Sequence, residues 1–254
     1  MEAEYPTESD IVHEIKNRVE ALEERIEAAC RRSGRKRREL RLMGVSKFHG
    51  LEAVEAAWKA GIKLFGESRV QEATGKFTVF REAYPGDGST ELHLIGSLQR
   101  NKAKKAADFF DCIQSVDRES LIDELGVLTT NRENPLMVLL EYHTGEESKA
   151  GFPGRDSLFR AAEKLLSFPG LRPMGLMTMA PFTSDTELIR RSFRELAVAR
   201  DELEKRFLNG DFYNGDVSGG YWDCLSMGMT NDFETAIEEG STLIRIGTAI
   251  FGER

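Results

Sequence analysis

The chain has 254 residues, of which 40% are hydrophobic and 31% are charged, a composition typical of a globular protein that buries a sizeable core. Acidic residues outnumber basic residues by 43 to 35, for a formal net charge of −8. The overall field therefore repels a nucleic-acid backbone, and any anion site has to be local. No apolar run reaches the length of a membrane span, and the three cysteines are odd in number and far apart. These features argue against a membrane anchor or a disulfide framework and predict a cytoplasmic protein with reduced thiols.

An amphipathic helix is predicted near the N-terminus. Apolar residues recur there every three or four positions with charges between them, the spacing of one buried helix face; they are Ile11, Ile15, Val19, Leu22, Ile26 and Ala29. The helix should stop near Gly34, inside the basic segment 31–38. We interpret residues 1–40 as this helix and a solvated basic linker. RNA binding through 31–38 is the alternative, which the acidic chain and the lack of interleaved aromatic residues disfavour.

Short apolar segments then alternate with longer, charged segments of helical periodicity. Eight of them are predicted strands: 41–47, 64–68, 92–98, 112–116, 136–142, 175–180, 224–228 and 243–251. An open doubly wound sheet is one way to arrange them. Eight repeats in this length, with no glycine-rich dinucleotide turn after the first strand, favour a closed barrel. The sequence predicts an α/β protein, a single (β/α)8 TIM-type barrel domain over 1–254. Residues 209–223 are predicted to form a loop on the face opposite the site, and no function is assigned to them.

The ends of the predicted strands carry the candidate site, because functional side chains of such barrels lie where strands end and βα loops begin. Lys47 follows the apolar sequence LMGVS. Partial burial there would lower the pKa of the lysine and leave a neutral amine as nucleophile, as Schiff-base formation requires. A lysine at a strand end is by itself more often simply solvated, so Lys47 needs support from elsewhere.

That support lies after the seventh and eighth strands, in the sequences SMGMTND and RIGTAIFG. Barrels of this class commonly bind a phosphate at these two loops through backbone N–H groups and small residues. Ser226 and Thr248 offer hydroxyl donors, while Gly228 and Gly247 remove side-chain obstruction. The sequence therefore predicts an anion cradle on the same barrel end as Lys47.

Three further features bear on the site. Arg245 lies within an apolar strand, where a guanidinium needs a partner; Glu67 and a cofactor ring nitrogen both remain open as that partner. Asn231 and Glu234 have the spacing of a capping box that opens the next helix. The four histidines lack metal-ligand spacing, and His93 is predicted to be a hydrogen-bonded strand residue rather than a ligand.

Several motifs together resemble one family, the pyridoxal phosphate homeostasis proteins, which share the barrel of alanine racemase. The motifs are GVSK ending at Lys47, FGESRVQE at 65–72, HLIGSLQRNK at 93–102, SKAGF at 148–152, GLMTMAP at 175–181, LSMGMTNDFETAIEEGST at 225–242 and RIGTAIFG at 245–252. The resemblance implies that Lys47 holds pyridoxal 5′-phosphate (PLP) as an internal aldimine. It implies that Ser226, Gly247 and Thr248 bind the cofactor phosphate and that Arg245 faces the pyridine nitrogen. Ser68 stands where the family usually has an asparagine near the cofactor. Its shorter hydroxyl puts in doubt the polar contact between this side chain and the cofactor.

The same resemblance bears on catalysis. An arginine beside the pyridine nitrogen keeps the ring a weak electron sink. A racemase also needs a second acid/base, which in alanine racemase is a tyrosine from another domain. Here Tyr142 is the one tyrosine placed near the mouth, and a packing role is an equal alternative for it. We expect a non-catalytic, monomeric carrier that stores, protects and delivers PLP, with PLP-requiring apo-enzymes as recipients and with effects on amino and keto acid levels. The alternative is a weak PLP-dependent racemase or lyase that uses Lys47 alone or with Tyr142.

Overall fold

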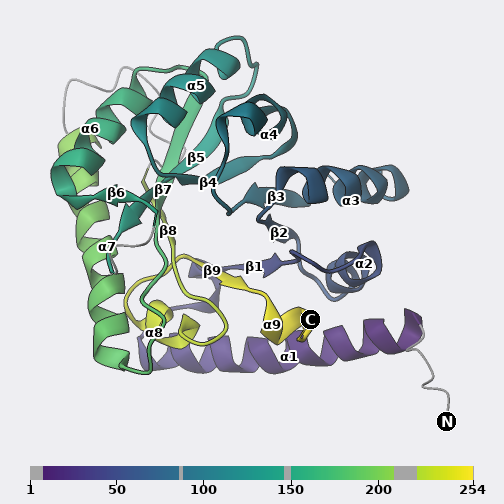
Figure 1. Ribbon diagram of the computed structural model, residues 1–254. Helices are drawn as coiled ribbons and strands as arrows, with labels where there is room; N and C mark the ends of the chain where they lie inside the picture. Colours follow the sequence, from purple (N-terminus) through teal and green to yellow (C-terminus); the bar gives the residue numbers. More distant parts are fainter. Residues whose placement is uncertain (1–7, 86–87, 146–149, 209–221, 254) are drawn as a thin grey trace.

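The computed structural model describes residues 8–85, 88–145, 150–208 and 222–253, and its centre is a closed ring of parallel strands (Figure 1). The eight barrel strands are β1 (Arg41–Val45), β2 (Leu64–Glu67), β3 (Glu91–Leu94), β4 (Cys112–Val116), β5 (Leu136–His143), β7 (Leu171–Met177), β8 (Cys224–Ser226) and β9 (Leu243–Ile246). They pair in chain order, β1 pairs with β9, and β4 pairs with β5, which closes the ring. A two-residue strand, β6 (Phe152–Pro153), adds to β5 outside this ring. The predicted (β/α)8 barrel is confirmed.

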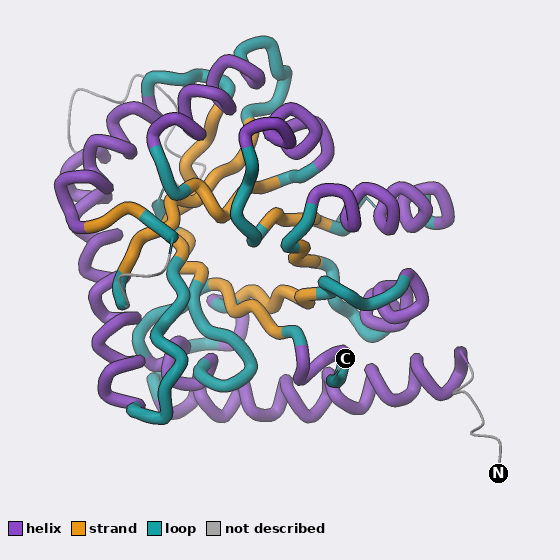
Figure 2. The backbone as a smooth tube through the Cα atoms, viewed as in Figure 1, coloured by secondary structure: helices purple, strands orange, loops and turns teal. Residues whose placement is uncertain are grey.

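Helices surround the strands, as Figure 2 shows in purple around orange. The longer ones are α1 (Glu8–Arg32), α2 (Leu51–Lys59), α3 (Val70–Ala83), α5 (Glu119–Thr129), α6 (Gly154–Leu166) and α7 (Thr186–Leu208). The shorter ones are α4 (Ala103–Phe109), α8 (Phe233–Glu238), α9 (Thr248–Phe251) and the 3-10 turns η1 (Arg37–Glu39) and η2 (Arg100–Lys102). Within the described ranges, no helix combines the length and the apolar character needed to cross a bilayer.

Three predicted strands differ from the observed strands by three or more residues at an end. The strand expected at 92–98 is β3, which ends at Leu94. The strand expected at 175–180 is β7, which begins four residues earlier and ends at Met177. The strand expected at 243–251 ends at Ile246, because the backbone at Gly247 leaves the extended region (φ −104°, ψ −83°) and α9 follows. That turn separates Arg245, inside the barrel, from Thr248 at its mouth. Of the predicted loop 209–223, residues 209–221 lie outside the described part of the chain.

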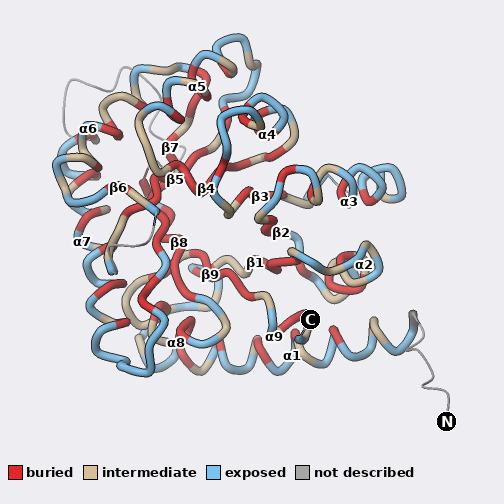
Figure 3. Tube along the Cα trace, viewed as in Figure 1, coloured by how far each residue is buried: buried red, intermediate tan, exposed pale blue. Residues whose placement is uncertain are grey.

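Successive residues of a strand face opposite sides, so each strand contributes to two separate cores. Figure 3 shows in red how burial concentrates along the central strands. On β9, Leu243 belongs to a small apolar cluster inside the barrel, whereas Ile244 and Ile246 pack outward in the large core under the helices. The three cysteines are free and buried, as predicted.

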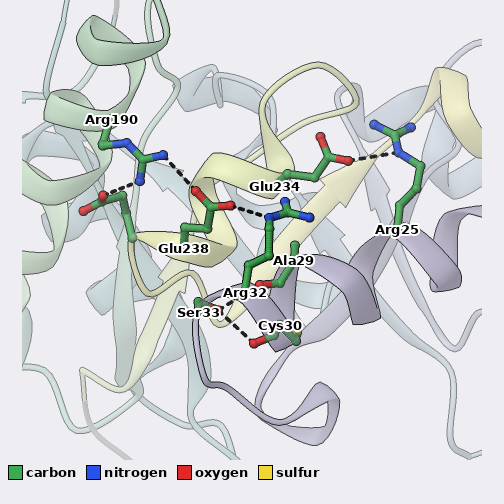
Figure 4. Close-up of polar contacts among 9 residues, drawn as sticks. Arg25, Ala29, Cys30, Arg32, Ser33, Arg190, Glu234 and Glu238 are labelled. Atoms are coloured by element: carbon green, nitrogen blue, oxygen red, sulfur yellow. Dashed lines mark hydrogen bonds and ion pairs between the residues drawn. The ribbon is translucent and has the colours of Figure 1, made fainter.

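The first helix covers one side of the barrel, where it packs against α2, α8 and α9. Five of its six predicted apolar positions are buried and Ile11 is partly buried, so the predicted amphipathic face is confirmed. Ion pairs join α1 to α8, Arg25 to Glu234 at 3.1 Å and Arg32 to Glu238 at 3.0 Å (Figure 4).

The basic segment after α1 is more than a solvated linker. The helix ends at Arg32, and Gly34 has a positive φ of 69°, as expected of a helix stop. Arg35 donates to the carbonyls of Ile237 and Ser241, at 3.0 and 2.6 Å. Arg37 donates two bonds to Glu23 at 2.6 and 2.7 Å. These cations are used within the protein, which weakens the RNA-binding alternative.

Candidate functional site

A cavity of about 540 Å³ opens at the carboxyl ends of the barrel strands. Five of the seven residues predicted to bind a cofactor line it, namely Lys47, Ser68, Arg245, Gly247 and Thr248. They come from three separate places in the chain, the ends of β1, β2 and β9. The structure therefore brings these five residues together in one cavity at this end of the barrel.

Lys47 lies two residues beyond β1 and is half-buried in the cavity wall. It forms no ion pair or hydrogen bond with any residue that the structure describes. The next residue, Phe48, has a left-handed backbone (φ 68°), a strained conformation for a bulky side chain. Contacts from α3 hold this turn: Phe48 N–H donates to Glu72 Oε1, and Lys76 Nζ donates to the carbonyls of Ser46 and His49 at 2.7 and 2.8 Å. The lysine is thus presented on a braced turn.

Glu67 braces the same turn and is not the partner of Arg245. Its side chain points out of the barrel towards α3, where Oε1 accepts hydrogen bonds from Ser46 Oγ at 2.6 Å and Lys76 Nζ at 2.8 Å. It is fully buried, and burial raises its pKa. Its second oxygen, Oε2, has no hydrogen-bond partner among the described residues. One of the two partners left open for Arg245 is therefore ruled out.

Arg245 points into the barrel and forms the floor of the cavity. Nη1 donates to Ser226 Oγ and Nη2 donates to the carbonyl of Thr178, each at 2.8 Å. Only 4% of the residue is exposed, and burial lowers the pKa of the guanidinium. Both hydrogen-bond partners are neutral, and the nearby carboxyl groups of Asp232 and Glu141 favour the charged form of the guanidinium without hydrogen-bonding to it.

Glu141 faces the same cavity from β5, across the ring from β1, and was not among the predicted site residues. It is 4% exposed, and burial, together with the nearby Asp117, raises its pKa to about 7. No described residue hydrogen-bonds to its carboxyl group. Strand alternation could have predicted this orientation from the sequence. Glu141 is two residues from Leu139, so both side chains face the barrel interior.

Tyr142, the neighbouring residue, faces outward instead. Its hydroxyl donates to Glu195 Oε1 of α7 at 3.1 Å, and the Arg155 guanidinium lies 5.4 Å from its ring centre. Burial raises its pKa to about 12. Of the two alternatives for Tyr142, packing and an acid/base role, this geometry favours packing, because Glu141 rather than Tyr142 lines the cavity.

The loop after β8 contributes to the cavity, but through other residues than those predicted. Ser226 is buried inside the barrel, where its hydroxyl donates to Gln114 Oε1 at 2.6 Å. Gly228 lies under α8 with φ +97°, and a Cβ there would approach the Ala236 side chain to 2.6 Å. Thr230 and Asn231 line the cavity instead. The composition of this loop predicted its place next to the cavity but did not show which of its residues face the cavity.

The two loops after β8 and β9 expose unused backbone donors. In the described structure, the N–H groups of Thr230, Asn231, Thr248 and Ala249 make no hydrogen bond. The capping box predicted for Asn231 and Glu234 was wrong. Helix α8 begins at Phe233 with Asp232 as its N-cap, and Asp232 Oδ1 accepts from Met229 N–H at 2.5 Å, which fixes the loop.

Ser68 lies at the edge of the cavity, next to Gly96 and Ser97. A Cβ on Gly96 would come within 2.3 Å of the Ser68 carbonyl, so this close approach requires glycine. The Ser68 hydroxyl makes no hydrogen bond with a described residue, which leaves it available to a ligand.

His93 is a hydrogen-bonded interior residue, as predicted. It is fully buried, with Nδ1 2.8 Å from Gln114 Nε2 and Nε2 3.3 Å from Glu91 Oε2. No cluster of metal-ligating side chains occurs in the described residues.

The donor set fits a small anion that also carries a carbonyl group. A half-buried primary amine from the end of β1 lines the cavity together with a buried guanidinium and a threonine hydroxyl from the neighbouring β9 and its loop. Free backbone amides of the loops after β8 and β9 complete the set. The cavity volume is in the range usual for cofactor-sized ligands. Amine attack on a carbonyl and anion capture by amides are both open to this arrangement.

Comparison with known proteins identifies the family to which the chain belongs. Residues 18–254 match the family "Alanine racemase, N-terminal domain". The chain is 37% identical over 237 residues to the pyridoxal phosphate homeostasis protein of Aquifex aeolicus, an alignment that covers 93% of this chain and 97% of that protein. It is 35% identical over 247 residues to the protein of the same name from Escherichia coli K12, covering 96% and 98%.

Solved structures agree with these matches. A crystal structure of an unknown protein from Bifidobacterium adolescentis has a TM-score of 0.84 and 34% identity, and covers 98% of each chain. The structure of PipY from Synechococcus elongatus with PLP bound has a TM-score of 0.76 and 28% identity, and covers 94% of this chain and all of that one. Alanine racemase from Clostridium difficile has a TM-score of 0.71 but 10% identity, with 57% of its chain covered, so it shares the fold alone. The chain belongs to the family of pyridoxal phosphate homeostasis proteins, built on the barrel of the alanine racemase N-terminal domain.

Proposed function

We propose that the chain is a single PLP-binding domain that holds the cofactor covalently, as a Schiff base on Lys47. The observation that carries the proposal is the meeting of Lys47, Arg245 and the unused backbone amides in one cavity. The PLP-bound structure of PipY, a relative covered over its full length, supports the choice of ligand. PLP supplies an aldehyde that condenses with amines and a ring that withdraws electrons.

The residues of this chain divide the work of binding. Lys47 provides the amine, and its braced turn aims it into the cavity. The amides and hydroxyls of the loops after β8 and β9, with Gly247, Thr248 and Thr230, receive the phosphate. Arg245 would face the cofactor ring as a permanent hydrogen-bond donor. Ser68 offers a hydroxyl at the cavity edge in place of the asparagine usual in the family. Ser226 and Gly228 contribute indirectly, by orienting Arg245 and by letting α8 pack closely.

Borohydride trapping tests the covalent link. PLP is added to the purified protein, the visible absorbance of the adduct is followed, and the adduct is reduced with borohydride and located by peptide mass spectrometry. We expect one label, on Lys47, and none in Lys47→Ala. Lys76→Arg serves as a matched control, because Lys76 contacts the same turn from α3 but is paired with Glu67. A label distributed over several lysines would contradict the proposal.

We further propose that the protein is a non-catalytic, monomeric carrier. It would store and protect PLP, deliver it to apo-enzymes that require it, and thereby affect amino and keto acid levels. The names of the curated relatives support a role in homeostasis. The test is to incubate the PLP-loaded protein with a panel of L- and D-amino acids. Turnover no faster than with free PLP is expected, and a clearly faster reaction would sink the carrier role.

Glu141 favours a second candidate function, a weak racemase or lyase. Its carboxyl faces the cavity from the strand opposite Lys47, and its pKa of about 7 suits proton transfer near neutrality. This candidate predicts exchange of the substrate α-proton with deuterated solvent. The exchange should disappear in Glu141→Gln and persist in Tyr142→Phe, since Tyr142 faces α7. Absence of exchange in the unaltered protein would remove this candidate.

A further inference from the structure

A continuous chain of hydrogen bonds runs through the inside of the barrel and ends on Arg245. In order from the cavity, this interior chain consists of Arg245, Ser226, Gln114, His93, Glu91 and Arg41, which come from strands β9, β8, β4, β3 and β1. Its links measure 2.8, 2.6, 2.8, 3.3 and 2.7 Å. Only the first member touches the cavity.

The far end of the interior chain fixes the state of His93. Arg41 Nη2 donates to Glu91 Oε2 at the opposite end of the barrel, where both side chains are about 40% exposed. The hydrogen bond from His93, with a contribution from Arg41, lowers the pKa of Glu91 to about 2, so Glu91 is ionised and can only accept. Burial lowers the pKa of His93 and favours its neutral form. His93 therefore carries its proton on Nε2, facing Glu91, and presents Nδ1 as an acceptor.

Each remaining link then has one direction. Gln114 must turn its Nε2 towards His93, so its Oε1 faces Ser226 and accepts the serine proton. The serine oxygen is left to accept, and Arg245 Nη1, which can only donate, fills that role. The order of donors is consistent from the ion pair at one end to the guanidinium at the other. The geometry thus uses both sides of the Gln114 amide, and the Ser226 hydroxyl is not free to donate to a ligand.

We propose that Gln114 and His93 are positioning residues that hold the Arg245 guanidinium, through Ser226, in one orientation at the cavity floor before any ligand binds. An arginine side chain has several rotatable bonds, and ordering it in advance removes that cost from binding. Retention of a ligand then depends on two buried residues that never touch it. The part concerning PLP rests on the function proposed above, whereas the orientation of Arg245 does not.

The first measurement needs no cofactor. In protein labelled with ¹⁵N-arginine, the unliganded wild type should give separate, slowly exchanging Nη signals for Arg245, because its guanidinium is held at both ends. In Gln114→Met, which keeps a similar volume but no amide, these signals should merge as rotation becomes free. Thr129→Val is the matched control: it removes a buried hydroxyl bonded to Leu125 at 2.8 Å, in α5 and away from the barrel interior. Unchanged Arg245 signals in Gln114→Met would overturn the proposal.

The second measurement is PLP titration of the same three proteins. Loss of one buried hydrogen-bond link is expected to weaken binding about tenfold in Gln114→Met and by less than about twofold in Thr129→Val. Equal affinities of wild type and Gln114→Met would contradict the inference. If none of the proteins binds PLP, the proposed function fails while the arginine signals still decide the positioning role. If Gln114→Met does not fold, Gln114→Asn, a shorter amide that cannot span both neighbours, replaces it.

Discussion

Two buried charges on the strands that flank β1 are handled in opposite ways. Glu67, at the end of β2, points out of the barrel and is paired with Lys76 at 2.8 Å, so its charge is neutralised locally. Arg245, on β9, lies inside the barrel with neutral hydrogen-bond acceptors, Ser226 and Thr178. A buried charge with an ionic partner stabilises the fold, whereas a buried cation that is hydrogen-bonded only to neutral groups can still attract an anion. The comparison separates residues that build the site from those that act in it.

The largest effect on stability is expected for the ion pair between Glu67 and Lys76. Lys76→Met leaves Glu67 buried without its cation and should lower the free energy of unfolding by about 3–5 kcal/mol. Urea denaturation at neutral pH measures it. Adding Glu67→Gln to this variant should recover part of the loss, because the uncompensated charge is gone. If Lys76→Met lowers the free energy of unfolding by less than about 1 kcal/mol, the ion pair with Glu67 does not stabilise the fold.

The next effect concerns Glu141 and pH. Its pKa is about 7 in the folded protein against 4.5 as the ordinary value, so the folded state binds this proton more tightly. Its contribution to stability is therefore complete below pH 4.5 and is lost as pH rises to about 7, by up to about 3 kcal/mol. Glu141→Gln should remove this loss, so that its stability relative to wild type increases with pH. Urea denaturation at several pH values measures the difference, and a difference independent of pH would contradict the assignment.

Arg245→Met is the counterpart of Lys76→Met. Because Arg245 has no ionic hydrogen-bond partner, replacing it with an apolar side chain should change the free energy of unfolding by only about 1 kcal/mol. PLP affinity should nevertheless fall at least about tenfold, as expected when a charged hydrogen bond is lost. The same denaturation and titration assays apply. Equal destabilisation by Lys76→Met and Arg245→Met would contradict the distinction drawn between the paired charge and the charge with neutral partners.

The smallest effect should come from the loop after β8. Thr230→Val removes one neutral hydroxyl from the cavity wall and should weaken PLP binding about threefold, with little change in unfolding. Its affinity for pyridoxal, which lacks the phosphate, should stay the same. Thr235→Val, at the third position of α8 and outside the cavity lining, is the control. If pyridoxal and PLP lose affinity equally, Thr230 does not contact the phosphate.

Local pattern was enough to predict much of this protein. The apolar spacing of α1, the eight strands and the positions of Lys47, Arg245, Gly247 and Thr248 near strand ends all follow from periodicity. Such features depend on a few consecutive residues, and a closed parallel barrel brings every strand end to one face. The sequence by itself therefore determined the fold and the end of the barrel that carries the site.

The tertiary structure decided which way individual side chains point. Glu141 rather than Tyr142 faces the cavity because alternation along β5 puts it on the same face as Leu139, and closure of the barrel makes that face the inner one. Ser226 turns inward to Gln114, 112 residues away in the chain, and Glu67 turns outward to Lys76. These choices depend on partners from distant strands and helices, which no local window of sequence contains.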